Sequence, residues 1–179
     1  DERVDRIPSV CKNKANTTVV FTPAIPQDFP QLKFFKANEF DVFKRSQVLG
    51  ELSKDLYCLA VGGTHGKTTT SSILAHLLRE SGKKITAFLG GISSNFGSNF
   101  ISEGNEYMVV EADEFDRSFL TLHPDLLCIT SMDADHLDIY QNAENLEDSF
   151  QSFAALVSNP NHRLVREGLD VSGVTFGTS

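Results

Sequence analysis

A short run of glycine, lysine and hydroxyl residues has the composition of a polyphosphate-binding loop. The run reads Gly63-Thr64-His65-Gly66-Lys67-Thr68-Thr69. Glycines in such a loop let backbone N–H groups approach phosphate oxygens closely. The lysine reaches the β- and γ-phosphates, and the hydroxyl that follows it ligates Mg²⁺. The sequence therefore predicts a nucleoside triphosphate site in which Lys67 neutralises phosphate charge and Thr68 holds a metal ion.

The segments on either side of the loop support this interpretation. Residues 57–61 form an apolar run typical of a buried parallel strand, and residues 71–78 carry apolar side chains at helical spacing. A helix that starts at the loop adds a favourable dipole for an anion. The loop is shorter than the general pattern, because Val61 stands where that pattern has its first glycine. The alternative, a glycine turn with a surface lysine, leaves the flanking strand and helix unexplained.

Two further segments carry side chains that could do chemistry. The first is Val109-Val110-Glu111-Ala112-Asp113-Glu114-Phe115-Asp116, and the second is Met132-Asp133-Ala134-Asp135-His136-Leu137-Asp138. Glu111 is the last residue of an apolar strand run, where a carboxylate is costly unless it has a partner. Because Mg²⁺ prefers oxygen ligands, Glu111 and Thr68 are the predicted ligands of one ion. We expect Asp113, Glu114 and Asp116 to form a solvated acidic loop, with a part for Glu114 in the site as the alternative. His136 stands out among the histidines because aspartates surround it.

Together, the loop and these two segments resemble the motifs of the Mur ligases, the ATP-dependent amide-forming ligases of cell-wall and folylpolyglutamate synthesis. The resemblance runs from about residue 19 to residue 140. It implies ATP and Mg²⁺ as cofactors and an acyl-phosphate intermediate. The amino-acid sequences of residues 118–124 and of residues 132–138, the histidine segment, most resemble those of the branch that joins L-alanine to UDP-N-acetylmuramate.

The resemblance also implies roles for individual residues. Lys67, Glu111 and His136 would be catalytic, with His136 at a second metal ion. The ATP-binding set would be Gly63, Thr64, His65, Gly66, Lys67, Thr68 and Thr69. In related ligases the region of residues 90–99 contacts the muramic acid, which makes Ser93, Asn95 and Asn99 candidates for substrate binding.

The order of the expected elements predicts an α/β fold with a doubly wound, mostly parallel sheet. Strands are expected at 57–61, 85–89, 107–111 and 126–131, and helices from the loop to 80 and over 143–157. Residues 90–99 are too polar and glycine-rich for an element, so we expect a loop there. Ligands bind at the carboxyl ends of strands in such sheets, where all three motifs would meet.

The family resemblance divides the chain into parts of two domains. Residues 1–54 would be the C-terminal part of a Rossmann-like domain that binds the UDP-sugar. Residues 55–179 would be the N-terminal part of the ATP-binding central domain. The chain starts without Met and shows no first glycine-rich turn and no third domain. We therefore expect a fragment that is inactive by itself.

Composition narrows the class of protein further. The net charge of −8 argues against a nucleic-acid binder, which would need a basic surface. The three cysteines lack metal-ligand spacing and fit buried thiols in a reducing compartment. We find no signal peptide and no apolar run long enough for a membrane span. A cytoplasmic protein without a membrane partner is expected, and the oligomeric state stays open.

Two alternatives remain beside the alanine-adding branch. One is the recycling ligase that attaches a whole tripeptide to the same sugar nucleotide. The other is a nucleotide-binding fragment that is not catalytic. The folylpolyglutamate branch fits less well, because nothing in the sequence resembles its folate loop.

Overall fold

The computed structural model describes residues 2–133 and 143–177. The chain divides between Leu49 and Gly50 into two compact units, and the division falls inside helix α2 (Arg45–Asp55). The assignment of residues 1–54 and 55–179 to two domains stays a prediction. In the described ranges no helix is both long enough and apolar enough to cross a membrane.

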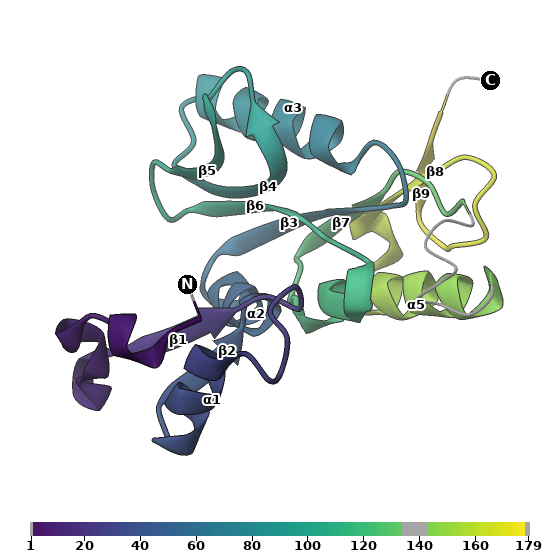
Figure 1. Cartoon of the computed structure of the whole chain (residues 1–179). Coiled ribbons are helices and arrows are strands. Elements are labelled where there is room, and N and C mark those ends of the chain that lie inside the picture. Colours follow the sequence, from purple (N-terminus) through teal and green to yellow (C-terminus); the bar gives the residue numbers. More distant parts are fainter. Residues whose placement is uncertain (1, 134–142, 178–179) are drawn as a thin grey trace. The chain divides into compact units, whose positions relative to one another are not determined.

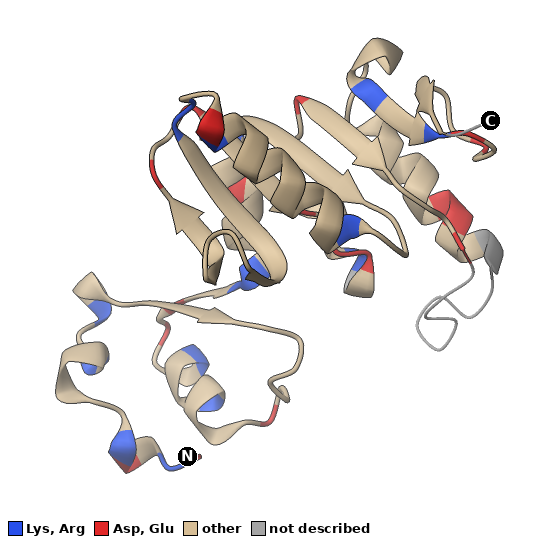
Figure 2. Ribbon diagram, turned by 90° about the horizontal axis from the view of Figure 1, so that it is seen from above, with Lys and Arg blue, Asp and Glu red and all other residues tan. Residues whose placement is uncertain are grey.

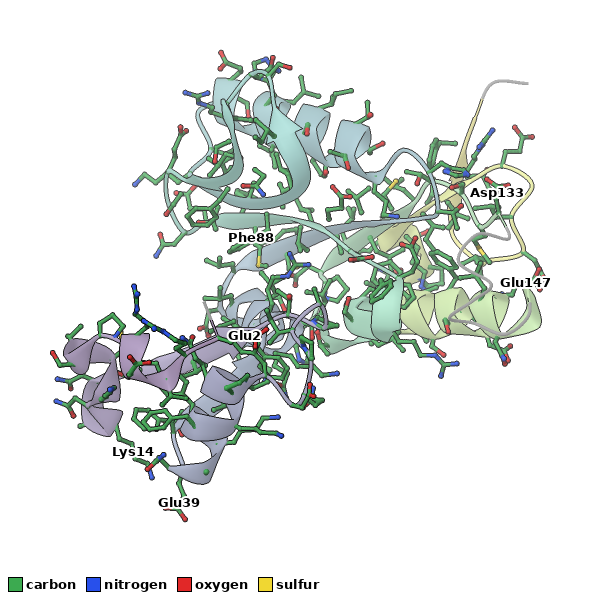
Figure 3. The ribbon with its side chains drawn as sticks, viewed as in Figure 1. Glu2, Lys14, Glu39, Phe88, Asp133 and Glu147 are labelled. Carbon is green, nitrogen blue, oxygen red and sulfur yellow. The ribbon has the colours of Figure 1, made fainter. Side chains whose placement is uncertain are left out.

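The first unit is a small α/β arrangement. Strands β1 (Thr18–Phe21) and β2 (Asp41–Lys44) pair in parallel, and helix α1 (Pro30–Ala37) connects them. Pro30 suits the first turn of α1, where its missing N–H would have no partner. Leu32 and Phe35 are the buried side chains of that helix. Three short 3-10 helices precede β1: η1 (Val4–Arg6), η2 (Ser9–Lys12) and η3 (Lys14–Asn16). Figure 3 labels Lys14 and Glu39, which form an exposed ion pair at 3.4 Å in this unit.

The second unit contains a seven-stranded sheet in the order β5-β4-β6-β3-β7-β8-β9. Every neighbouring pair is parallel except β4 with β5, which is antiparallel. The strands are β3 (Tyr57–Gly62), β4 (Ile85–Ser93), β5 (Ser98–Ser102), β6 (Tyr107–Glu111), β7 (Leu126–Ile129), β8 (Arg163–Arg166) and β9 (Val174–Phe176). The predicted α/β fold with a mostly parallel sheet is confirmed.

Helices cover both faces of this sheet. Figure 1 shows α3 (Lys67–Glu80) on one side and α5 (Ala143–Ala155) on the other, with η4 (Phe115–Thr121) beside α5. The core under α3 consists of Leu59, Ala75, Ile85, Ala87, Leu89, Ile101 and Val109. On the α5 side, the ring of Phe119 stacks on Phe153 with centroids 4.7 Å apart. Alternate residues of each central strand serve these two layers, which explains why the strand sequences are continuously apolar.

The expectation of a loop over residues 90–99 is wrong. Strand β4 continues to Ser93, and β5 begins at Ser98, so the stretch forms the end of a β-hairpin. Glycines and asparagines are depleted in strands, so their presence in this stretch obscured the apolar pattern by which a strand is recognised. Antiparallel pairing of β4 with β5 holds the strand on either side of the two glycines, because Phe88 pairs with Phe100 and Ser93 with Ser98, and the register shifts between them.

Candidate functional site

The glycine-rich loop joins the most buried strand of the sheet to a helix. Strand β3 ends at Gly62, and α3 begins at Lys67 with Gly66 as its N-cap in a left-handed conformation. Gly63 has a φ of +136°, and a Cβ there would lie 2.2 Å from Thr130 Oγ1. Only glycine fits such a position without strain. The strand, turn and helix predicted around the loop are therefore present.

The Lys67 ammonium is held inside the loop by three contacts. Nζ donates to the Gly63 carbonyl oxygen at 2.6 Å and to the Glu114 oxygens Oε1 and Oε2 at 3.0 and 2.8 Å. The Glu114 side chain is only 1% exposed. The expectation that Glu114 belongs to a solvated acidic loop is wrong. A buried carboxylate is costly unless it is paired, and Lys67 provides a cation for it.

Thr68 and Glu111 meet as the sequence predicted for two ligands of one ion. Strands β3 and β6 are adjacent and place Val61 opposite Glu111. Thr68 Oγ1 donates to Glu111 Oε1 at 2.9 Å, while the Gly90 N–H donates to Glu111 Oε2 at 2.6 Å. The carboxylate is thus fixed from both sides, with one oxygen beside the hydroxyl.

The donor set of this pair fits a hard cation. A hydroxyl and one carboxylate are enough for Mg²⁺, which keeps several waters and takes further oxygens from phosphate. Within the ranges that the structure covers, no cluster of three or more His, Cys, Asp or Glu side chains could hold a metal. Beyond Thr68 and Glu111, such an ion would take ligands from phosphate and water.

A network of hydroxyls ties the loop to the segment after β7. Thr64 Oγ1 and Ser131 Oγ lie 2.8 Å apart, and the His65 N–H donates to Ser131 Oγ at 2.7 Å. Thr130 Oγ1 donates to the His65 carbonyl oxygen at 2.6 Å. The Asp133 N–H donates to Thr64 Oγ1 at 3.0 Å, and Figure 3 labels Asp133. The loop and the start of the histidine segment therefore form one hydrogen-bonded unit.

Sequence reasoning missed Thr130 and Ser131 as parts of this site. Both follow the apolar run of β7 directly, and the end of a strand next to the loop strand was the available signal. Hydroxyl side chains are common at the ends of strands, so only the folded structure shows that Thr130 and Ser131 contact the loop.

The remaining predicted residues lie at different distances from the loop. Thr69 is exposed in the first turn of α3. Ser93 is buried at the end of β4, while Asn95 in the hairpin turn and Asn99 in β5 are exposed. The hairpin also approaches the loop, because a Cβ on Gly91 would lie 3.5 Å from Thr68 Cγ2.

His136, with the neighbouring Asp135 and Asp138, lies outside the described residues. Its predicted place at a second metal ion stays a prediction. His65 is exposed, and its Nε2 lies 3.9 Å from Asp133 Oδ2.

Charge is spread over the molecule. Figure 2 shows basic and acidic residues interspersed along both units. The basic charge at the loop is thus a local feature that Lys67 supplies at the start of α3.

Comparisons with known proteins identify relatives that cover the loop and the strands around it. The model of the Mur ligase middle domain matches residues 61–168. A UDP-N-acetylmuramate–L-alanine ligase of Christiangramia forsetii is 54% identical over 169 residues, which cover 94% of this chain and 37% of that protein. The chain thus spans a little over a third of the length of this curated relative.

Two solved structures are similar in fold. The UDP-N-acetylmuramate–alanine ligase of Thermotoga maritima aligns with a TM-score of 0.75 at 28% identity, covering 96% of this chain and 41% of that one. The UDP-N-acetylmuramate:L-alanyl-γ-D-glutamyl-meso-diaminopimelate ligase of Neisseria meningitides aligns with a TM-score of 0.72 at 22% identity, covering 84% and 52%.

Proposed function

The chain belongs to the Mur ligase family, and we propose that the full-length protein joins L-alanine to UDP-N-acetylmuramate in an ATP-dependent reaction. The observation that carries the proposal is the meeting of Lys67, Thr68 and Glu111 at the carboxyl ends of β3 and β6. The 54% identity to a relative with that printed name supports the choice of amino acid. The likeness to the tripeptide-type ligase, at 22% identity, supports the fold alone.

The proposed chemistry sets the demands on the site. A carboxylate is a poor acceptor for an amine, so the γ-phosphoryl group of ATP first converts it to an acyl phosphate. The amine then attacks the acyl carbon and expels phosphate. The protein contributes chiefly positioning and charge neutralisation in such a transfer.

Each described residue has a defined part in this proposal. Backbone N–H groups of the loop and the α3 N-terminus bind the phosphates, and Lys67 neutralises charge on the transferred group. Thr68 and Glu111 would hold Mg²⁺, which neutralises further phosphate charge when it is bound. We assign His136 to a second ion by family resemblance.

The acceptor side of the site is assigned to the β4–β5 hairpin. Asn95 and Asn99 expose their side chains there, whereas Ser93 is buried, so the two asparagines are the accessible candidates for the sugar nucleotide. Residues 1–54 are assigned to the UDP-sugar-binding domain and residues 55–179 to the ATP-binding central domain. Because ATP is the phosphoryl donor, the reaction belongs in the cytoplasm.

The test is a phosphate-release assay on the full-length protein with ATP, Mg²⁺ and UDP-N-acetylmuramate. L-alanine should accelerate release, while the free tripeptide and L-glutamate should not. Thr68→Ala should lower the rate at least about a hundredfold, because it removes a proposed metal ligand. Thr70→Ala, the same change two residues along α3, is the matched control and should stay within about twofold of the unsubstituted protein.

Other outcomes would assign the protein elsewhere. A preference for the tripeptide would make it a recycling ligase. Phosphate release that ignores the sugar nucleotide would make it a simple nucleotidase, and nucleotide binding without turnover would make it a binding protein.

A further inference from the structure

The buried ion pair between Lys67 and Glu114 has no part in the chemistry proposed above. Glu114 lies just before η4, in the segment that follows β6, and its side chain is 1% exposed. Both of its carboxylate oxygens lie within 3.0 Å of Lys67 Nζ. We propose that Glu114 is a positioning residue that holds the Lys67 ammonium in the loop and neutralises its charge, and that a metal-bound nucleotide has to compete with Glu114 for Lys67. The inference rests on the proposed nucleotide function of the loop.

The hydrogen bonds of Lys67 support a resting position. An ammonium group has three donors. Here the three acceptors are the Gly63 carbonyl oxygen and the two Glu114 oxygens. Lys67 can therefore donate to a phosphate oxygen only if one of these three hydrogen bonds breaks. Glu114 competes with the phosphate for the same cation.

Glu111, the last residue of β6, and Glu114, three residues further along the chain, have different partners. Glu111 is bound to Thr68 and Gly90, whereas Glu114 is bound to Lys67. One ammonium and two carboxylates thus surround the place where the phosphates would bind. These three groups together repel a metal-free polyphosphate, because the charge of the Lys67 ammonium is already neutralised by Glu114. The divalent cation must then contribute to nucleotide binding itself, and not only to the chemical step.

The predicted consequence is a split between binding and turnover. In Glu114→Gln the competing charge is gone, so Lys67 is free to contact the nucleotide. Metal-free ADP, measured by calorimetry in EDTA with the full-length protein, should bind about tenfold more tightly. Turnover with ATP and Mg²⁺ should fall about tenfold, because Lys67 is no longer held in position. A residue with a purely structural role would weaken both.

Asp113→Asn is the matched control. It removes one negative charge from the neighbouring residue, and its remaining amide oxygen can still accept from the Phe115 N–H, as Asp113 Oδ1 does. It should change ADP binding less than about twofold. The proposal is overturned if Glu114→Gln does not tighten the binding of metal-free ADP, or if Asp113→Asn tightens it equally.

A stability measurement tests the pair without any ligand. Lys67→Met should lower the unfolding midpoint, because it removes the Lys67 ammonium from the buried Glu114 carboxylate. The double variant Lys67→Met with Glu114→Gln should recover most of that loss. A double variant no more stable than Lys67→Met overturns the proposal. If Glu114→Gln alone does not fold, this stability comparison takes the place of the binding measurement.

Binding measurements on two variants distinguish the proposed function of the loop from the role of Glu114. If Lys67→Met binds Mg²⁺–ATP as well as the unsubstituted protein, the proposed function of the loop is wrong, while the stability rescue can still succeed. If Lys67→Met abolishes nucleotide binding and Glu114→Gln changes nothing, the proposed function stands and the role of Glu114 is wrong.

Discussion

The substitution Gly90→Ala tests the geometry of the proposed metal site with a single methyl group. A Cβ at residue 90 would lie 2.3 Å from Glu111 Oε1 and 2.6 Å from Oε2. Non-bonded carbon and oxygen atoms need more than 3 Å, so the carboxylate has to move by about 1 Å. That movement disturbs its hydrogen bonds to the Gly90 N–H and to Thr68 Oγ1.

The expected cost falls on function and not on stability. The Glu111 carboxylate is the far end of a flexible side chain and can move cheaply. Gly90 is not among the glycines with positive φ, so alanine suits its backbone and even gains about 0.5–1 kcal/mol in a strand. We expect the free energy of unfolding to change by less than about 1 kcal/mol. Displacing a group that orients a metal ligand typically costs about 10–100-fold in metal affinity or activity.

The assay is the Mg²⁺ dependence of phosphate release by the full-length protein. Gly90→Ala should raise the Mg²⁺ concentration for half-maximal rate and lower kcat/KM, each by about 10–100-fold. Gly91→Ala is the matched control, because its Cβ would meet only Thr68 Cγ2 at an ordinary 3.5 Å. It should stay within about twofold. Normal Mg²⁺ dependence in Gly90→Ala, or an equal loss in Gly91→Ala, would refute the reasoning.

Four further outcomes are expected from the same structure. Lys67→Met should lower kcat/KM by at least about a hundredfold in the phosphate-release assay, because it removes the cation proposed for the transferred group. Gly63→Ala should lower the free energy of unfolding by more than about 2 kcal/mol in a denaturant titration, because it combines a φ of +136° with a clash against Thr130. Burial raises the pKa of the Cys58 thiol to about 12 and that of Cys128 to about 11, so neither should react with iodoacetamide at pH 8 unless the protein unfolds. Since these raised values keep the proton on the folded thiols, their contribution to stability is complete below about pH 8.5 and should decline as the pH rises above it, which denaturant titrations at several pH values can measure.

The sequence by itself determined the central strands and the loop. Continuous apolar runs predicted β3 and β6, and the glycine, lysine and threonine pattern placed the start of α3. It also predicted that Thr68 and Glu111 would meet, because neighbouring parallel strands end at the same edge of a sheet. These inferences depend on local periodicity and on chain direction, and both are present in a linear sequence.

The tertiary structure alone decided which polar groups are buried and paired. Glu114 looks like any acidic loop residue in the sequence, yet it is buried against Lys67, 47 residues away. Thr64 and Ser131 form their contact across 67 residues. The same holds for the hairpin, where β4 runs through Gly90 and Gly91 because it pairs with β5 at Phe88 before them and at Ser93 after them. Solvation of a charge and pairing of a strand depend on neighbours that only the folded chain brings together, so no local pattern encodes them.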